Sequence, residues 1–317
     1  MTSALLEVKN LKKVFTVGAG IKKKKVQAVR DVSFTINKGE TFGLVGESGC
    51  GKSTTGRLAI RLIEPSSGSI TFGEKDVTMA KEKELRTMRR EMQMIFQDPY
   101  ASLNPRMTIE KILTEPYKLQ GLYTTEERNK RVISLMEEVG LRPAYRTRFP
   151  HEFSGGQRQR IGIARALALN PKLIVADEPV SALDVSVQAQ VLNLMIDLQE
   201  KYGLSYLFIS HDLSVVKYIC HRVGVMYLGE IVEIGPKETL YENPLHPYTQ
   251  ALLSSIPSVD QRDRERIILS GDVPNPANPP SGCSFHPRCP SCMDICKIEK
   301  PAAKQIGDQL VSCHLYN

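Results

Sequence analysis

Gly46-Glu47-Ser48-Gly49-Cys50-Gly51-Lys52-Ser53 decides the fold of this chain, because it fits G-x-x-x-x-G-K-[ST], the pattern of a phosphate-binding P-loop. Residues 41–45 form an apolar run that predicts a buried strand, and residues 53–63 predict a helix. Glycines let backbone N–H groups wrap a polyphosphate closely, and the helix N-terminus adds its dipole. Lys52 would reach the β and γ phosphates, and the Ser53 hydroxyl would ligate Mg²⁺. The stretch therefore predicts nucleotide binding.

Length and composition indicate a globular protein larger than one ordinary domain. The chain has 317 residues, of which 41% are hydrophobic and 24% are charged, so it can bury a sizeable core. It contains no run of eighteen apolar residues, and its start lacks the basic region and apolar core of a signal peptide, so we expect a cytoplasmic location. The formal charge of +7 fits either an anionic partner or a mildly basic soluble protein.

The residues before the P-loop predict strands, and those after its helix predict a short strand followed by helices. Residues 5–36 alternate apolar and polar side chains, as half-buried antiparallel strands do, with a basic loop at 22–25 that is either a solvated hairpin tip or a contact with membrane headgroups. Phe15 could stack on an adenine base or be a core residue. Residues 69–72 predict a short strand, residues 81–90 a charged helix and residues 107–142 further helices.

Three predicted strands end in polar side chains. Residues 92–96 lead to Gln97 and a proline-bounded loop at 100–105. Asp177 and Glu178 follow the apolar run 173–176, and His211 follows the strand 206–210. Ligands of open α/β sheets bind beyond the carboxyl ends of the strands, which predicts that the two acids lie near the P-loop. Asp177 would hold Mg²⁺ through water, and Glu178 would polarise the attacking water.

A second phosphate-binding element follows the helical region. Ser154, Gly155, Gly156 and Gln157 begin an apolar helix that we expect to reach residue 169, and a Ser-Gly-Gly helix start offers exposed N–H groups, a hydroxyl and a dipole. Residues 181–184 predict a loop, and residues 185–202 predict an amphipathic helix.

In this order the motifs resemble the ATP-binding cassette (ABC) ATPases of membrane transporters, over about residues 5–235. The resemblance implies an α/β P-loop core with an antiparallel β subdomain and a helical subdomain that carries the signature. It also implies that two cassettes pair head to tail, so that Ser154 to Gln157 complete the site of a partner. Phe153 departs from the family's most common leucine, but both residues are apolar.

The resemblance also assigns site residues. Glu178, His211 and Gln97 would be catalytic, with His211 at the γ phosphate, while Ser53, Gln97 and Asp177 would hold Mg²⁺ and Gln97 would sense coupling to a membrane subunit. The residues expected to bind ATP are Phe15, Gly46, Glu47, Ser48, Gly49, Cys50, Gly51, Lys52, Ser53, Thr54, Ser154, Gly155, Gly156, Gln157 and Asp184.

Three longer stretches look like the dipeptide and oligopeptide importer ATPases, namely residues 96–105, 178–186 and 246–249. That subfamily implies an ATP-hydrolysing subunit at the cytoplasmic face of the cell membrane. Its expected partners are a second homologous ATPase, two permeases and an extracytoplasmic peptide-binding protein, with no nucleic acid. Nickel and glutathione importers share these features. A non-transport cassette ATPase acting on nucleic acid is the other alternative, since a P-loop kinase would leave Ser154 to Gln157 and His211 without a role.

The C-terminal tail begins with proline-rich residues 236–282, which predict a linker over a surface rather than new core, so we divide the chain into domains 1–238 and 239–317.

Five of the seven cysteines lie beyond residue 282. In a reducing compartment such a cluster favours metal binding over disulfides. The importer family's tail implies a 4Fe-4S cluster on Cys283, Cys289, Cys296 and Cys313, with Cys292 as a non-ligand. A zinc site of four cysteines, or of three with His286, and reduced free thiols are the alternatives.

Overall fold

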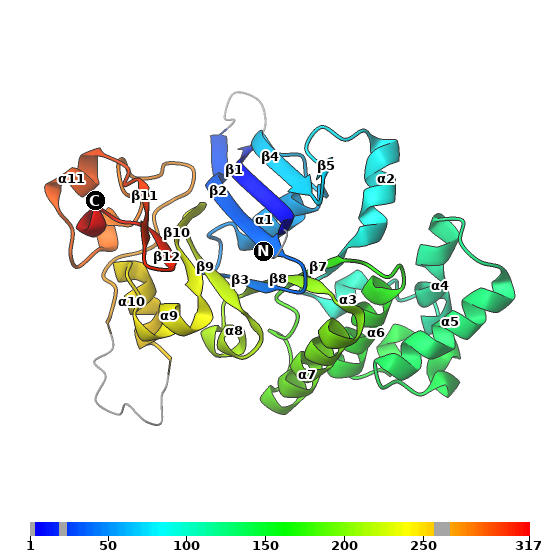
Figure 1. Cartoon of the computed structure of the whole chain (residues 1–317). Helices are drawn as coiled ribbons and strands as arrows, with labels where there is room; N and C mark the ends of the chain where they lie inside the picture. The colour runs from blue at the N-terminus through cyan, green and yellow to red at the C-terminus, as the bar shows by residue number, and fades with distance from the viewer. Residues whose placement is uncertain (1–3, 19–23, 257–266) are drawn as a thin grey trace. The chain divides into compact units, whose positions relative to one another are not determined.

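The computed structural model describes residues 4–18, 24–256 and 267–317. The chain divides into two compact units (Figure 1). The first unit contains residues 1–80 and 208–317, and the second contains residues 81–207. Strand β8 (Ser205–Ser210) contains the boundary between residues 207 and 208. The P-loop therefore belongs to the first unit, and the signature belongs to the second.

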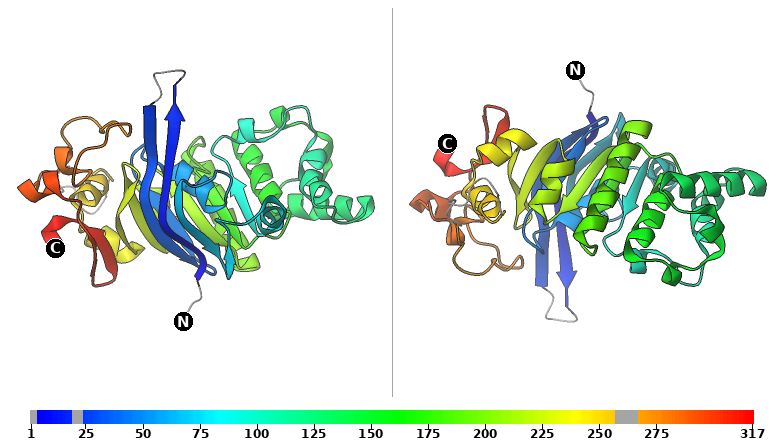
Figure 2. Two further views of the ribbon diagram at one scale, coloured as in Figure 1. Left: turned by 90° about the horizontal axis from the view of Figure 1, so that it is seen from above. Right: turned by 90° about the horizontal axis from the view of Figure 1, so that it is seen from below.

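Two long strands begin the first unit. β1 (Ala4–Val17) and β2 (Lys24–Asn37) pair antiparallel and run side by side (Figure 2), which confirms the prediction for residues 5–36. β1 also pairs antiparallel with β4 (Ser67–Phe72), which pairs with β5 (Lys75–Asp76). Leu6, Leu11 and Val32 are fully buried, as the alternation of apolar residues requires. In the predicted basic loop, residues 22–23 lie outside the described residues, while Lys24 and Lys25 begin β2.

The strands of the first unit follow the order β5-β4-β1-β2-β10-β9-β3. β3 (Thr41–Val45) is buried at every position and pairs parallel with β9 (Arg222–Tyr227), which pairs antiparallel with β10 (Glu230–Pro236). α1 (Lys52–Ala59) follows β3, and α8 (Leu213–Ile219) precedes β9. The strand and helix predicted around the P-loop are therefore both present.

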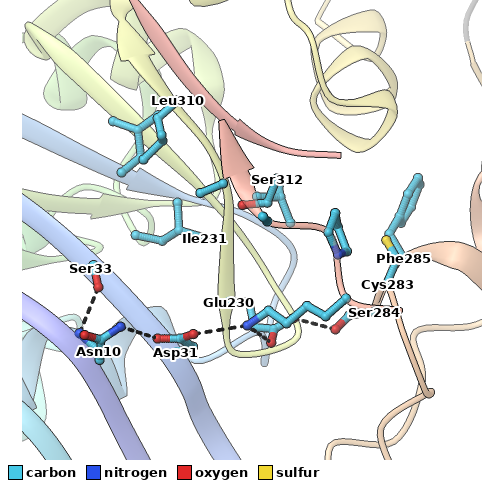
Figure 3. Close-up of a pocket in the computed structure, with 16 residues that line it drawn as sticks. Asn10, Asp31, Ser33, Glu230, Ile231, Cys283, Ser284, Phe285, Leu310 and Ser312 are labelled. Carbon is cyan, nitrogen blue, oxygen red and sulfur yellow. Dashed lines mark hydrogen bonds and ion pairs between the residues drawn. The ribbon is translucent and has the colours of Figure 1, made fainter. Parts of the chain in front are cut away.

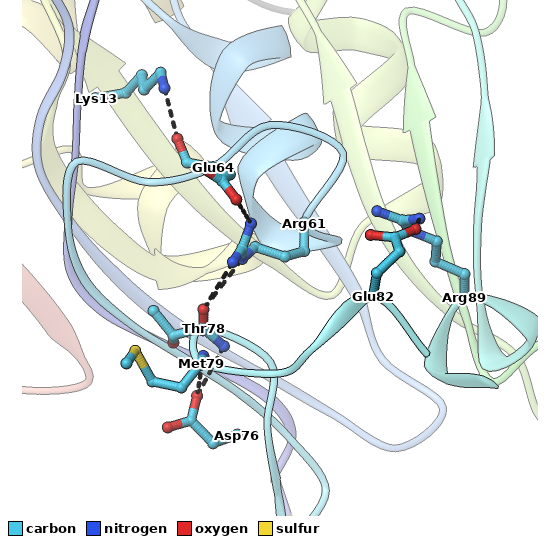
Figure 4. A network of polar contacts seen from close by, with 8 residues as sticks. All are labelled: Lys13, Arg61, Glu64, Asp76, Thr78, Met79, Glu82 and Arg89. Carbon is cyan, nitrogen blue, oxygen red and sulfur yellow. Dashed lines mark hydrogen bonds and ion pairs between the residues drawn. The ribbon is translucent and has the colours of Figure 1, made fainter. Parts of the chain in front are cut away.

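Helix α1 is shorter than the predicted 53–63, because the chain turns at Arg61. Arg61 adopts a φ of 56°, which breaks the helical path. Its guanidinium donates to the Thr78 carbonyl at 3.2 and 3.0 Å and to Glu64 at 3.1 Å (Figure 4). Lys13 also donates to the carbonyl of Glu64 at 2.6 Å. These long-range contacts hold a turn that local helix propensity does not predict.

The second unit combines a parallel strand pair with helices. β6 (Met92–Ile95) and β7 (Leu173–Asp177), both predicted as strands, pair in parallel. α4, α5 and α6 contact one another, which confirms a helical region that carries the signature. The helices of this unit are α2 (Glu82–Glu91), α3 (Pro99–Ser102), α4 (Ile109–Leu119), α5 (Thr125–Glu138), η2 (Pro143–Thr147), η3 (Pro150–Glu152), α6 (Gly155–Leu167) and α7 (Val185–Tyr202).

One element of the second unit differs from the prediction. The proline-bounded loop expected at 100–105 begins with the short helix α3, because the Asp98 carboxylate accepts from the N–H groups of Tyr100 and Ala101 at 2.7 and 3.2 Å, with Pro99 at the first helical position. An N-cap followed by proline is a recognisable helix start. The prediction missed it because the helix is only four residues long.

The prediction of a surface linker for residues 236–282 was wrong for residues 237–254. α9 (Lys237–Glu242) and α10 (Pro247–Ser254) occupy this stretch, and Leu240 and Tyr248 are fully buried. Pro236 and Pro247 stand at helix starts, where a missing N–H group costs nothing. Proline content alone could not distinguish helix starts from a linker.

The remaining C-terminal segment adds strands to the sheet of the first unit. β12 (Gln309–Ser312) pairs antiparallel with β10 and with β11 (Ala303–Ile306). η4 (His286–Arg288), α11 (Asp294–Ile298) and η5 (His314–Tyr316) are short helices. Within the described residues, none of the helices has the length and apolar character needed to span a membrane.

Candidate functional site

The P-loop path depends on two glycines that no other residue could replace without strain. Gly46 has a φ of 150°, and a Cβ there would lie 2.1 Å from the carbonyl oxygen of Met226. Gly51 has a φ of 106°, and its Cβ would lie 2.3 Å from the carbonyl oxygen of Ala28. The loop therefore passes directly against the backbones of β9 and β2, which only glycine permits.

Lys52 is buried inside the loop that it serves. Its side chain is 4% exposed, and Nζ donates to the carbonyl oxygens of Gly46 at 2.7 Å and Glu47 at 3.0 Å. Burial raises the pKa of the Cys50 thiol, which the nearby Lys52 opposes. Ser53 and Thr54 lie half-buried in the first turn of α1, where the predicted Mg²⁺ and phosphate contacts would form. The lysine ammonium is therefore held by two carbonyls of its own loop.

Phe15 and His211 also belong to the first unit. Phe15 lies on β1 with its ring partly exposed, and Lys13 Nζ lies 5.1 Å from the ring centroid. The residue is partly buried, so adenine stacking and a packing role both stay predictions. His211 directly follows β8 and is exposed. His211 therefore lies at the end of a strand, as predicted, and Asp212 after it caps α8 by accepting from the N–H groups of Ser214 and Val215.

In the second unit, the end of β7 carries the two acids. Asp177 is fully buried, and Glu178 is half-buried with a φ of 46°, an uncommon conformation for a side-chain-bearing residue. Such strain persists where the surrounding structure enforces it and is common at functional sites. The Gln97 amide Nε2 donates to Glu178 Oε2 at 2.9 Å. Two residues predicted to act on ATP are thus joined directly, from the ends of two adjacent parallel strands.

The signature forms the start of α6 through a capping box. Ser154 Oγ accepts from the Gln157 N–H at 3.3 Å, and Gln157 Oε1 accepts from the Ser154 N–H at 3.1 Å. A Cβ on Gly156 would lie 2.4 Å from Val187 Cγ1, whereas one on Gly155 would meet Leu183 at 3.3 Å. Gly156 therefore packs against α7, while Ser154 is exposed.

Asp184 is the N-cap residue of α7. It is exposed, and its carbonyl accepts from the N–H groups of Val187 and Gln188 at 2.9 and 2.8 Å. Val185 beside it is 81% exposed. The predicted loop therefore presents its carboxylate at the surface, as a residue that contacts a partner's nucleotide would require.

The tail cysteines lie near one another. Burial, together with the nearby thiols of Cys296, Cys313 and Cys289, raises the pKa of Cys283 to about 11. Burial and neighbouring thiols also raise the pKa values of Cys289 and Cys313. Cys292 is exposed. Among the described residues, however, no group of three or more His, Cys, Asp or Glu side chains has a geometry that could hold a metal ion.

Tyr248 and Arg288 contact the P-loop, and the sequence reasoning missed both. The Glu47 N–H donates to Tyr248 Oη at 2.9 Å. The Arg288 guanidinium donates to both carboxylate oxygens of Glu47 at 2.8 and 3.1 Å. Tyr248 lies within the stretch 246–249, which had served only to narrow the family. No local pattern marks contacts across 201 and 241 residues.

Two family models match the chain. The model described as "ABC transporter" matches residues 29–181, and "Oligopeptide/dipeptide transporter, C-terminal region" matches residues 232–296. The oligopeptide transport ATP-binding protein AppF of Bacillus subtilis is 57% identical over 99% of this chain and 98% of the relative. The probable peptide ABC transporter ATP-binding protein y4tS of Sinorhizobium fredii is 52% identical over 99% of this chain and 91% of the relative.

Solved structures show the same cassette. The ATP-binding cassette MJ0796, solved as a dimer in a post-hydrolysis state with ADP and Pi, matches with a TM-score of 0.66 and 29% identity over 73% of this chain and 98% of the cassette. CbiO1 of Clostridium perfringens matches with a TM-score of 0.66 and 25% identity over 76% of this chain and 91% of CbiO1. With its motifs, its fold and its relatives in agreement, the chain belongs to the ABC transporter ATPases of the oligopeptide and dipeptide subfamily and is an ATPase coupled to transport.

Proposed function

We propose that this chain is the ATP-hydrolysing subunit of an importer that takes up dipeptides or oligopeptides across the cytoplasmic membrane. Its relatives AppF and y4tS are named for oligopeptide and peptide transport, and their similarity extends over almost the whole chain. The match of residues 232–296 to the oligopeptide/dipeptide C-terminal region is the observation that carries the cargo assignment, because the cassette itself occurs with many cargoes.

The ATP site is proposed to use the P-loop for binding and β7 for hydrolysis. Backbone N–H groups of residues 48–53 and the Lys52 ammonium would hold the phosphates, and Phe15 would stack on the base. Mg²⁺, held by Ser53, Gln97 and Asp177, would neutralise charge that develops on the phosphates. Glu178 would accept a proton from the attacking water, and His211 would donate to the γ phosphate.

The Gln97 side chain links this chemistry to the membrane subunits in our proposal. Its donation to Glu178 Oε2 holds the base in one orientation, since a carboxylate that accepts an amide N–H has less rotational freedom. A shift of the strand end that carries Gln97 would then change the orientation of Glu178. Hydrolysis would in this way respond to the state of a docked permease.

An ABC ATPase implies dimerisation and permease partners, as the dimeric MJ0796 cassette illustrates. We propose that the partner is a second, homologous ATPase, that Ser154 to Gln157 and Asp184 complete its ATP site, and that two permeases and an extracytoplasmic peptide-binding protein complete the importer. The chain would act at the cytoplasmic face of the membrane. Residues 239–317 would form its specialised C-terminal domain.

We further propose that Cys283, Cys289, Cys296 and Cys313 hold a 4Fe-4S cluster. Their chemistry suits the group, because each thiolate would bind a different iron and the ligands need not converge on one point as they do around zinc. The mutual effect of these thiols on their pKa values supports their proximity. Anaerobic purification with iron, sulfide and zinc analysis tests this. Near-stoichiometric iron and sulfide, lost in Cys289→Ser but kept in Cys292→Ser, is expected, whereas zinc alone or no metal would reject the cluster.

Glu178→Gln tests the assignment of the base. Removing a general base lowers turnover by roughly 10² to 10⁴, while the isosteric amide keeps the shape of the site. ATP hydrolysis and peptide uptake by the complete transporter in vesicles should both fall by this factor, with ATP binding retained. Equal ATPase rates in mutant and parent would reject the role of Glu178. Uptake of nickel or glutathione instead of peptides by the parent would reassign the cargo.

A further inference from the structure

Two side chains from the C-terminal half of the first unit, Tyr248 and Arg288, form hydrogen bonds with Glu47 of the P-loop. The backbone N–H of Glu47 donates a hydrogen bond to Tyr248 Oη of α10 at 2.9 Å. The guanidinium of Arg288, from η4, donates two hydrogen bonds to the Glu47 carboxylate. A bidentate guanidinium–carboxylate pair restricts both side chains more than a single contact does. Both partners are distant in sequence from the loop, so neither contact arises from local folding.

Tyr248 and Arg288 are themselves buried and packed against aromatic rings. The Arg288 side chain is 9% exposed, and Tyr248 is fully buried. The ring of Tyr248 contacts Tyr227 and Phe285 with centroids 4.7 and 5.3 Å away, and Arg288 lies 6.0 Å from the centroid of Tyr227. Packing against buried rings leaves the phenol and guanidinium little freedom to move. Tyr248 and Arg288 therefore hold Glu47 in one position.

The position of Glu47 matters because the loop continues directly from it to the phosphate-binding N–H groups. Gly46 before it is pressed against Met226, and the Glu47 carbonyl accepts from Lys52 Nζ at 3.0 Å. Because Lys52 bonds to the Glu47 carbonyl, the contacts of Tyr248 and Arg288 with Glu47 constrain Lys52 as well. In addition, Arg288 offsets a negative charge that would otherwise stand next to a polyphosphate, where like charges repel.

We propose that Arg288 and Tyr248 are positioning residues for ATP binding, which act through Glu47 on the P-loop and make nucleotide affinity depend on the C-terminal region. The proposal rests on the proposed assignment of residues 46–53 as the ATP-binding loop. Neither residue touches nucleotide in this scheme. Their effect is to hold the loop open in the geometry that the phosphates require and to neutralise the Glu47 carboxylate.

The test measures equilibrium binding of a fluorescent ATP analogue to the full-length chain, and the ATPase kinetics of the complete transporter. Arg288→Gln should weaken binding by roughly 10-fold, since a hydrogen-bonded charged pair is lost and Glu47 is left half-buried without its cation. Tyr248→Phe should weaken binding by a smaller factor. KM for ATP should rise in both variants while kcat at saturating ATP changes much less, as expected for loss of binding rather than chemistry.

A matched control uses another contact between the same C-terminal region and the sheet. Lys300 pairs with Glu230 at 2.9 Å and with Asp31 at 3.2 Å beside a cavity of about 380 Å³ (Figure 3), and all three residues lie outside the P-loop sequence. Lys300→Gln should lower thermal stability without changing the affinity for the ATP analogue. The iron content of each variant should also match the parent, so that a disturbed cysteine region is recognised.

The double variant Glu47→Gln/Arg288→Gln separates positioning from simple unfolding. Removing both charges eliminates the unpaired carboxylate, so nucleotide affinity should recover part of the loss seen in Arg288→Gln. Unchanged affinity in Arg288→Gln and Tyr248→Phe, or an equal loss in Lys300→Gln, would overturn the proposal. A parent chain that fails to bind the ATP analogue would instead overturn the ATP-site assignment on which the proposal depends.

Discussion

The P-loop and the signature, the two segments that we propose to bind phosphate, are built in different ways. The P-loop, residues 46–53, has glycines at positive φ whose missing side chains let it lie against the backbones of β2 and β9, and it is held at Glu47 by residues 201 and 241 positions away. The signature, residues 154–157, is a helix start whose polar groups bond to one another within four residues. The first depends on tertiary contacts, whereas the second is nearly complete as a local structure.

This difference fits the two tasks that we propose. A loop that wraps a polyphosphate must hold many N–H groups in one fixed arrangement, which requires support from several elements. A segment that covers a partner's nucleotide must be exposed and needs only a well-formed helix start. The substitutions and pH change described below test this difference between the P-loop and the signature.

The largest expected effect follows from Gly155→Asp in the signature. A carboxylate at this position would face the partner's γ phosphate, so hydrolysis at the partner's site should fall by on the order of 10² or more, comparable to losing a key electrostatic contact. Binding of ATP to the P-loop of the variant should stay at the parent's value. ATPase assays of the assembled dimer and nucleotide binding to the isolated subunit measure the two quantities. Loss of nucleotide binding by the isolated variant would show that the signature serves its own chain's site.

Gly51→Ala should disable the P-loop instead. The new Cβ would meet the Ala28 carbonyl oxygen at 2.3 Å with a φ of 106°, so the loop must move and ATP affinity should fall roughly 100-fold, in keeping with strain of a few kcal/mol. Gly39→Ala is the matched control, because Gly39 has a φ of 74° and open space around it. Nucleotide titration should find the control close to the parent. Similar affinity in Gly51→Ala and Gly39→Ala would contradict the tight fit of the loop.

Acidification should weaken the support of the P-loop through His246. Burial lowers the pKa of this imidazole to about 3, and its neutral Nδ1 accepts from the Tyr248 N–H at 3.0 Å, capping α10. The unfolded chain binds a proton below its ordinary pKa of 6.5 and the folded chain does not, so stability falls as pH drops below 6.5, by about 2 kcal/mol at pH 5.

Urea denaturation of the parent and of His246→Asn between pH 7.5 and 5 measures this contribution. The amide oxygen of asparagine can cap the helix without titrating, so the variant should lose less stability on acidification. The raised pKa of the buried Glu233 contributes in the opposite direction, but that residue is present in both chains. Parallel pH dependences in parent and variant would show that His246 does not stay neutral in the fold.

The smallest expected effect is that of Ser154→Ala. Loss of the N-cap of α6 should cost about 1 kcal/mol of stability, as is usual for such caps. Thr124→Ala removes a similar capping box at the start of α5, where Thr124 Oγ1 accepts from Glu127 at 3.3 Å. Both variants should lose similar stability in urea denaturation, but only Ser154→Ala should slow hydrolysis by the dimer. Equal ATPase rates in the two variants would limit Ser154 to a structural role.

The sequence alone determined much of this protein. β3, β7 and α7 could be predicted because a continuous apolar run or an amphipathic repeat suffices to specify each, and the P-loop, signature and importer motifs identify a family whose relatives cover nearly the whole chain. Local reasoning failed where a single long-range contact decides the conformation. Arg61 ends α1 early by bonding to Thr78, and α9 and α10 pack as core where proline content had indicated a linker.

Only the tertiary structure decided what holds the P-loop. Glu47 is a variable position of a common motif, and Tyr248 and Arg288 lie in segments that the motifs left without a mechanical role. Tyr248 and Phe285 are buried in the unit, and the largely buried Arg288 pairs with Glu47 there, as a buried charge requires. A motif records the residues that meet the ligand, whereas the contacts that position the motif depend on the packing of the whole unit.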